Sequence, residues 1–489
     1  MNKLDVEMSI DDIFSEYSYE LQLLADLDYE EKQDSMEAFL SKPRKINYHF
    51  ARRENQRDIL FSFDFEDANI AFNLGKKGKY VLVYLDFITK ESESGWSYSF
   101  DLVTPRGLYV YQSYLGTDVN WIEWNDYSRI STYIQLSNVK TELKVAEKQY
   151  YLLRLDSLDK SIHRTEQASL YMSVYDYSLL GAGDAAIPVL EPFPGMIGLV
   201  YKGPKLPNPV IPSFAQRRVY VKVNNVGQGN WNEVISRAKT RVVYDIGTYK
   251  EKKKRNQYII DLIQKHPYDR KPSLILSHWD LDHYNVFLYM TDKEREQFSQ
   301  LIVTSTIPSL TPFRMLQSVY AQKKVEIKLV DNNFTLSTGV LKPIDVKNGQ
   351  LNLFVCPLKQ GMKKVYTNES GLLLDVNAVD KNVLLTGDSS YDQANEAVIQ
   401  SYATFTQDKD HYLVIPHHGG GHTPDYQMPK HCHLKACAIS VDEYRYDKSK
   451  RQYVVGKNGH PTIEVECHFM KKHGCRVYRT DYSNDDIIM

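Results

Sequence analysis

The stretch His278-Trp279-Asp280-Leu281-Asp282-His283 decides which fold and which chemistry to expect from this chain. It follows Leu274-Ile275-Leu276, an apolar run after Pro272 that predicts a short buried strand ending in a loop. The bend at a strand end allows two histidines and two aspartates to face one point. An ordinary solvated loop does not need imidazoles and carboxylates at this density, so we predict a metal site.

The composition is that of a soluble globular protein. The 489 residues are 42% hydrophobic and 25% charged, which allows two or three domains. The net charge of −2 gives no general attraction to nucleic acid or membranes, so local charge or a metal has to attract an anionic substrate. The acidic N-terminus has no apolar core and no run is long enough to span a bilayer. We therefore expect a cytoplasmic protein without membrane contact, and the odd number of cysteines, 5, fits free thiols.

The N-terminal 202 residues predict two unlike parts. Ser9-Ile10-Asp11-Asp12 has the form of a capping box and predicts a helix within an N-terminal helical segment, residues 1–45. Residues 46–202 contain short Tyr- and Phe-rich runs separated by turn residues, which predict a mostly antiparallel β-rich accessory domain. We expect its strands to include residues 59–65, 80–87 and 109–114. Its role is open between a sensor, a specificity module and an oligomerisation surface.

A proline-rich linker separates these parts from the last domain. Residues 203–213 contain four prolines, which stiffen the chain and exclude regular structure. We expect the last domain to span residues 214–489. Of the 14 histidines, all but His49 and His163 lie after residue 265, so metal chemistry belongs to this domain.

Several strands predicted in residues 214–489 end in turns with polar side chains. Val226-Gly227-Gln228-Gly229-Asn230 predicts a hairpin turn, and the next strand ends at Asp245. Val383 to Thr386 leads into Gly387-Asp388, and Leu413 to Ile415 leads into Pro416-His417-His418-Gly419. The apolar strands before Asp388 and His417 therefore deliver candidate ligands to loops.

These motifs resemble the metallo-β-lactamase superfamily, whose second motif is usually His-x-His-x-Asp-His. Asp280 occupies the place of the second histidine, as in the C-terminal hydrolase domain of ComEC-type DNA-uptake proteins. The resemblance covers about residues 216–485 and implies an α/β fold, with an αββα sandwich in residues 214–489. ComEC-type proteins combine this domain with a membrane channel that this sequence lacks, so DNA uptake is not implied.

The resemblance implies roles for individual residues. Asp245 is expected to orient the metal loop, with Asn230 and Asn368 also beside the ligands. Asn368-Glu369-Ser370 lacks the third-motif histidine of many members, which leaves one metal subsite short of a ligand. The implied metal ligands are His278, Asp280, Asp282, His283, Asp388 and His418, and the implied catalytic residues are Asp282, His417 and His460.

Two assignments stay open at this point. His417 and His418 could exchange their roles as proton-handling group and ligand. A carboxylate in place of an imidazole adds negative charge and favours metal ions that prefer oxygen ligands. We therefore expect one or two divalent ions, manganese or zinc, with magnesium as an alternative.

A basic run precedes the central motif. Lys252, Lys253, Lys254 and Arg255 could steer a phosphodiester backbone toward the metal loop. The same run fits the solvated start of a helix equally well.

The function implied by the resemblance is metal-dependent phosphodiester hydrolysis, most of all a nuclease acting on DNA or RNA through a metal-bound hydroxide. One alternative is a small-molecule phosphodiesterase, for example for a cyclic nucleotide, or another hydrolase. A second alternative is an inactive scaffold that acts as a sensor or interaction module. The expected partner is nucleic acid or another phosphodiester, with a protein partner or a homo-oligomer formed through the N-terminal domain. Phage defence is expected by analogy only.

Overall fold

The structure is a computed structural model of the chain. The predicted helical segment 1–45, the run Lys252 to Arg255 and His460 lie outside the residues that it describes. Described are residues 47–50, 59–62, 80–92, 95–103, 105–116, 132–167, 171–180, 187–193, 199–201, 207–214, 219–227, 229–248, 261, 267–268, 270–322, 324–332, 334, 336, 340–357, 368–402, 409–420, 424–429, 432–441, 445–447, 452–454, 461, 463–483 and 486–489.

Two seven-stranded sheets make up most of the described C-terminal half. The first has the order β17-β15-β14-β13-β12-β11-β27, and the second has the order β18-β19-β20-β21-β22-β23-β26. The first comprises β11 (Val219–Val223), β12 (Asn232–Ser236), β13 (Lys239–Tyr244), β14 (Ser273–Ile275), β15 (Gln300–Thr304), β17 (Glu326–Val330) and β27 (Ile487–Ile488). The second comprises β18 (Lys342–Ile344), β19 (Leu351–Val355), β20 (Leu372–Asn377), β21 (Lys381–Leu385), β22 (Lys409–Val414), β23 (Cys432–Ile439) and β26 (Arg476–Arg479).

The two sheets share one apolar core. Val221 and Val242 of the first sheet lie in the same buried cluster as Leu353 and Leu374 of the second. Each strand presents alternate residues to its two faces, so the other face of each sheet needs its own cover. Residues of α6 (Leu281–Tyr289) and α8 (Leu310–Gln322) cover the first sheet, and residues of α9 (Tyr391–Tyr402) and α10 (Ile463–Cys467) cover the second. The chain is thus mixed α/β, as predicted.

Parallel strands bring several loops to one edge of this pair of sheets. β13 pairs with β14, β21 with β22 and β22 with β23, all in parallel. Because parallel neighbours have their carboxyl ends at the same edge, the residues that follow β13 and β14 lie together in the first sheet, and those that follow β21, β22 and β23 lie together in the second. The two sets of loops meet, since a Cβ on Gly387 would lie 2.6 Å from the Ser277 side chain. These loops contain the motifs singled out in the sequence.

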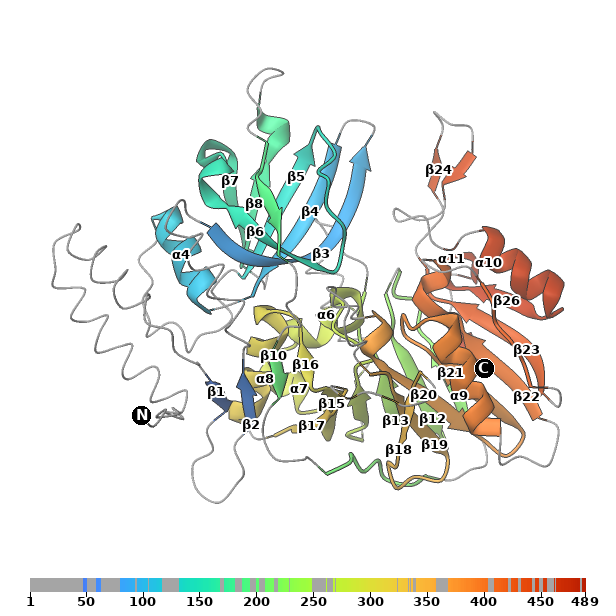
Figure 1. Ribbon diagram of the computed structural model, residues 1–489. Helices are drawn as coiled ribbons and strands as arrows, with labels where there is room; N and C mark the ends of the chain where they lie inside the picture. The colour runs from blue at the N-terminus through green and yellow to red at the C-terminus, as the bar shows by residue number, and fades with distance from the viewer. Residues whose placement is uncertain are drawn as a thin grey trace.

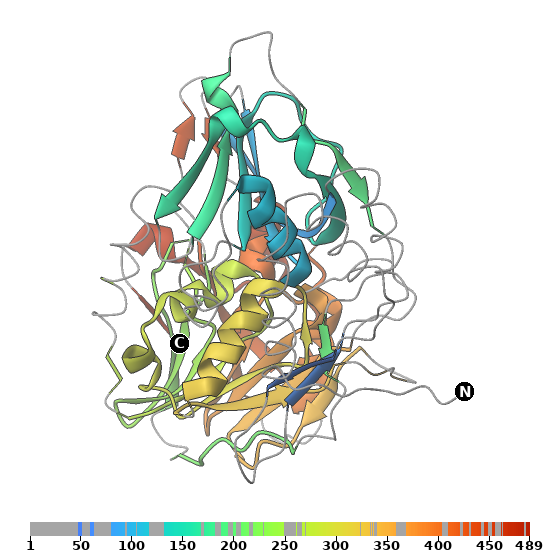
Figure 2. The same ribbon diagram turned by 90° about the vertical axis from the view of Figure 1, so that its left-hand side faces the viewer.

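A third sheet lies in the N-terminal half, in the order β7-β8-β5-β4-β3-β6-β9. All its pairings are antiparallel except β5 with β8. It lies above α6 and α8 in both views, and its buried residues share one cluster with theirs (Figures 1 and 2). Its strands are β3 (Tyr80–Ser92), β4 (Gly95–Leu102), β5 (Tyr133–Val139), β6 (Gln149–Arg154), β7 (His163–Gln167), β8 (Tyr171–Asp176) and β9 (Leu190–Pro192).

The two halves are also joined through smaller elements. β1 (Asn47–Phe50), β2 (Ile59–Ser62) and β10 (Leu199–Tyr201) form a sheet with β16 (Thr306–Ile307) of the C-terminal half. Asp101 accepts hydrogen bonds from the backbone N–H and the hydroxyl of Thr311, at the start of α8. The remaining α-helices of the described chain are α4 (Pro105–Leu115), α7 (Asp292–Arg295) and α11 (Thr480–Ser483), and β24 (Arg445–Asp447) and β25 (Gln452–Val454) form a hairpin.

One predicted strand is wrong. Residues 109–114 belong to α4, in which Leu108, Tyr111 and Tyr114 are buried at a spacing of three residues. Tyr-rich composition suggested a strand, but this spacing puts the aromatic rings on one face of a helix.

Two further sequence expectations can be compared with the described residues. The 5 cysteines are free thiols, and Cys356, Cys432, Cys437 and Cys475 are buried. Within the described part of the chain no helix combines the length and the apolar character needed to cross a membrane.

Candidate metal centre

The central motif ends the connection between β14 and α6, and its last three residues, Leu281 to His283, form the first turn of α6. The loop is held by backbone contacts, because the N–H of Asn230 donates to the carbonyl of Asp282, and that of Ile246 donates to the carbonyl of His283. Gly247 packs directly on this loop, so a Cβ there would lie 1.7 Å from the Asp282 carbonyl oxygen. Only glycine permits this approach, which explains the Asp-x-Gly turn.

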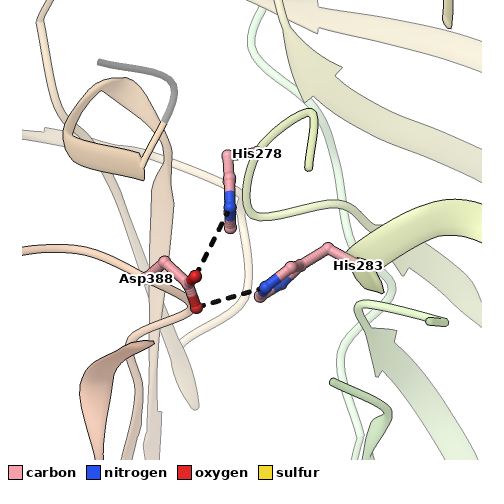
Figure 3. A group of neighbouring side chains, drawn as sticks. All are labelled: His278, His283 and Asp388. Atoms are coloured by element: carbon pink, nitrogen blue, oxygen red, sulfur yellow. Dashed lines mark ion pairs between the residues drawn. The ribbon is translucent and has the colours of Figure 1, made fainter. Parts of the chain in front are cut away.

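Side chains from two further loops converge on this motif, so three loops contribute to the centre. Asp388, which follows β21, places Oδ1 3.1 Å from His283 Nε2 and Oδ2 3.9 Å from His278 Nε2 (Figure 3). His418, which follows β22, places Nε2 3.5 Å from Asp282 Oδ2 and 3.9 Å from Asp388 Oδ1. Two groups thus have candidate ligand atoms within 4.8 Å of one another: His278, His283 and Asp388, and Asp282, His283 and His418.

The nitrogen and oxygen atoms that converge here are arranged to bind a cation rather than to form hydrogen bonds with one another. Five of them are buried and make no hydrogen bond of good geometry in the described structure, although two of the five, His283 Nε2 and Asp388 Oδ1, lie 3.1 Å apart as an ion pair. They are His278 Nε2, Asp282 Oδ1, His283 Nε2, Asp388 Oδ1 and His418 Nε2. Buried polar atoms without partners are rare and costly, and these five lie around one centre. A divalent ion bound among them would satisfy imidazole nitrogens and carboxylate oxygens at once.

Residues behind the loop fix how the imidazoles point. Asp245 Oδ2 lies 2.9 Å from His283 Nδ1, and the Ser277 N–H and hydroxyl donate to the same carboxylate at 2.6 and 2.8 Å. Because a carboxylate accepts the Nδ1 proton, His283 Nε2 is the ring nitrogen left to bind a cation at the centre. His418 is held similarly, with Nδ1 2.8 Å from the Ser440 carbonyl oxygen.

The backbone at His417 and His418 lies in the left-handed region. Their φ angles are 51° and 52°, which side-chain-bearing residues rarely adopt. This turn aims the two imidazoles differently: His418 is buried at the centre, whereas His417 is 23% exposed. His417 Nδ1 lies 3.0 Å from Asp388 Oδ2 and 3.0 Å from Asn368 Nδ2. Strain of this kind is typical of functional loops.

Charge at the centre is strongly coupled. Burial raises the pKa of Asp388, but the His283 and His417 imidazoles outweigh it and hold that pKa well below its usual value. Burial lowers the pKa of His283, while Asp388 and Asp245 raise it well above the ordinary value. The carboxylates are therefore anionic, and positive charge is needed at this point, as protons or as a metal ion.

Two residues expected at the site, Asn230 and Asp280, lie outside the two groups of converging ligand atoms. Asn230 Nδ2 lies 3.5 Å from His283 Nδ1, at the limit of a hydrogen bond. Asp280 Oδ2 lies 3.4 Å from His278 Nε2 and also forms a 2.7 Å ion pair with Lys148 of the N-terminal half. Lys148 could not be predicted as part of this site, because no pattern around it in the sequence distinguishes it from a surface lysine.

Comparison with known proteins adds little to this geometry. No family model matches the sequence, and no curated protein matches it. A solved structure described as a metal-dependent hydrolase of the β-lactamase superfamily is similar, with 12% identity and a TM-score of 0.31 over 54% of this chain and 96% of that chain. A similarity of this extent does not constrain the chemistry, which depends on the centre's own residues.

Proposed function

We propose that this chain is a metal-dependent phosphodiester hydrolase with a metallo-β-lactamase arrangement of its C-terminal half, acting on DNA or RNA. The observation that supports it most is the set of five buried donor atoms without hydrogen-bond partners, contributed by three loops at one edge of two sheets. We assign Asp282, His283, Asp388 and His418 as ligands of a divalent ion.

The donor set supports a phosphodiester rather than another ester. Two carboxylates beside two imidazoles favour ions such as manganese or zinc, which also bind phosphoryl oxygens. An ion bound there would polarise a phosphoryl oxygen and lower the pKa of a bound water toward ~7.

The chain's own residues supply orientation and proton transfer. Asp282 has Oδ1 without a partner in the described structure, so it can orient an attacking water as well as bind the ion. His417 contacts Asp388 yet is partly exposed, which suits a group that gives a proton to the leaving oxygen. General acid catalysis of this kind is worth about 10²–10⁴ in rate.

A cleavage panel tests the proposal. Single-stranded DNA, double-stranded DNA, RNA and cyclic nucleotides are incubated with the full chain and manganese, magnesium or zinc, beside an Asp282→Ala variant. We expect polynucleotide cleavage that needs metal and is abolished in the variant. Cleavage of cyclic nucleotides alone would support the small-molecule alternative, and no cleavage despite bound metal would support the interaction module.

A further inference from the structure

Lys148 carries a positive charge from the N-terminal sheet into the metal loop. It directly precedes β6, and its N–H donates to the Leu85 carbonyl at 2.7 Å, with φ at 59°. Its Nζ lies 2.7 Å from Asp280 Oδ2 and 3.0 Å from Asp86 Oδ1. The Lys148 side chain is 13% exposed and both aspartates are 3% exposed, so this ion pair is shielded from solvent.

The ammonium group of Lys148 contacts a carboxylate oxygen of the central motif. Asp280 Oδ2 is the atom nearest to Lys148, and the same atom faces His278 Nε2 at 3.4 Å. Neither group of converging ligand atoms includes Asp280, although Asp280 belongs to the central motif. Asp280 therefore has its charge balanced by the protein itself.

Two further contacts hold the ammonium group of Lys148 beside Asp280. Asp86 holds it from the other side and in turn accepts a hydrogen bond from the Tyr133 hydroxyl. The Lys148 Nζ also lies 4.4 Å from the Phe87 ring centroid, a cation–π contact that fixes the charge in place. A buried charge that loses its partner strongly destabilises the folded protein. Lys148, Asp86 and Asp280 therefore depend on one another to remain charged and buried.

We propose that Lys148 takes the place of a second metal ion, and that it restricts the centre to one divalent ion bound by Asp282, His283, Asp388 and His418. This inference rests on the metal centre proposed above. The N-terminal half thereby sets the metal content of a site in the C-terminal half. In this role Lys148 is a positioning residue and does not touch the substrate.

Metal content measured without any activity assay tests the inference. The full-length wild type, Lys148→Met and Lys144→Met are stripped with a chelator, loaded with manganese and desalted. Bound manganese is then measured by mass spectrometry, and its coupling by electron paramagnetic resonance. Lys144 is the matched control because it is exposed on the same segment.

We expect wild type and Lys144→Met to bind about one ion per chain with an uncoupled spectrum, because Lys148 keeps Asp280 from binding a second ion. Lys148→Met should bind about two and show a coupled pair, because Asp280 then needs a cation. Two ions in the wild type would overturn this inference but not the proposed function. The same holds for one ion in Lys148→Met, provided that its melting curve is unchanged and the variant is therefore folded. A wild type that binds no ion would overturn the proposed function as well.

A second variant keeps the test decisive if Lys148→Met does not fold. Asp280→Asn should still bind one ion, because Asp280 is not a ligand of it in this proposal, whereas Asp282→Asn should lose the ion. Loss of the ion in Asp280→Asn to the same degree as in Asp282→Asn would overturn the assignment of Asp280 to Lys148.

Discussion

Replacing Asp245 with asparagine should weaken metal binding while leaving the fold largely intact. Asp245 Oδ1 accepts from the Ser277 N–H, and Oδ2 accepts from the Ser277 hydroxyl and His283 Nδ1. An asparagine of the same size can keep the first bond, but its NH₂ group then faces His283 Nδ1. That nitrogen must become an acceptor, so the proton moves to Nε2, where it blocks the metal.

The size of the effect follows from the bonds that are lost. A hydrogen bond to a charged group contributes about 1.5–3 kcal/mol, and removing a residue that orients a ligand lowers metal affinity by about 10–100-fold. This fold-change equals roughly 1.4–2.7 kcal/mol of binding free energy, in agreement with one such bond. The opposite orientation of the amide would set NH₂ against the Ser277 N–H, at a cost of about 1–3 kcal/mol.

Titration calorimetry with manganese measures this affinity directly. The matched control is Asp375→Asn, because Asp375 is an equally buried carboxylate whose partners, Asn352 and Asn382, lie on the second sheet. We expect Asp375→Asn to lower the melting temperature without changing the metal affinity. If Asp245→Asn bound manganese as tightly as wild type, the proposed orientation of His283 would be refuted.

Three further predictions concern the turns and the core. Gly247→Ala should disrupt the metal loop and lower metal affinity, because its Cβ would collide with the Asp282 carbonyl; Gly349→Ala, with open space around it, should bind as wild type does. His418→Ala should lose the metal, whereas His417→Ala should keep it and lose cleavage rate by about 10²–10⁴; the reverse pattern, in metal analysis and single-turnover kinetics, would exchange the two roles. Burial lowers the pKa of His411 to about 3. Between pH ~6.5 and pH ~3 this histidine therefore takes up a proton in the unfolded chain but not in the folded one. The free energy of unfolding should then fall by up to ~1.4 kcal/mol for each pH unit in this range as the pH is lowered. Chemical denaturation between pH ~4 and ~7 should show a shallower slope for His411→Gln, and equal slopes would be inconsistent with this pKa.

The sequence predicted the part of the fold in which local pattern and packing agree. Apolar runs before Asp245, His278, Asp388 and His417 appear as β13, β14, β21 and β22 because both sheets are covered on both faces. Residues 109–114 were misassigned because tyrosine is common in strands and the burial of α4 on one face depends on a distant sheet.

The contribution of the N-terminal half to the centre could not be predicted. Lys148 and Asp280 are separated by 132 positions in the sequence and meet only because the N-terminal sheet packs on α6. No periodicity or motif encodes such a contact. The ligand motifs were visible because strand ends concentrate them within a few residues, whereas an ion pair between residues far apart in the sequence leaves no local signature.

Anomalous diffraction from crystals soaked in manganese tests the central claim most directly, namely that three loops hold a divalent ion. We predict a peak about 2.0–2.3 Å from His283 Nε2, His418 Nε2 and the nearest carboxylate oxygens of Asp282 and Asp388. A map without a peak at that point, with these four side chains placed as described, would contradict the account.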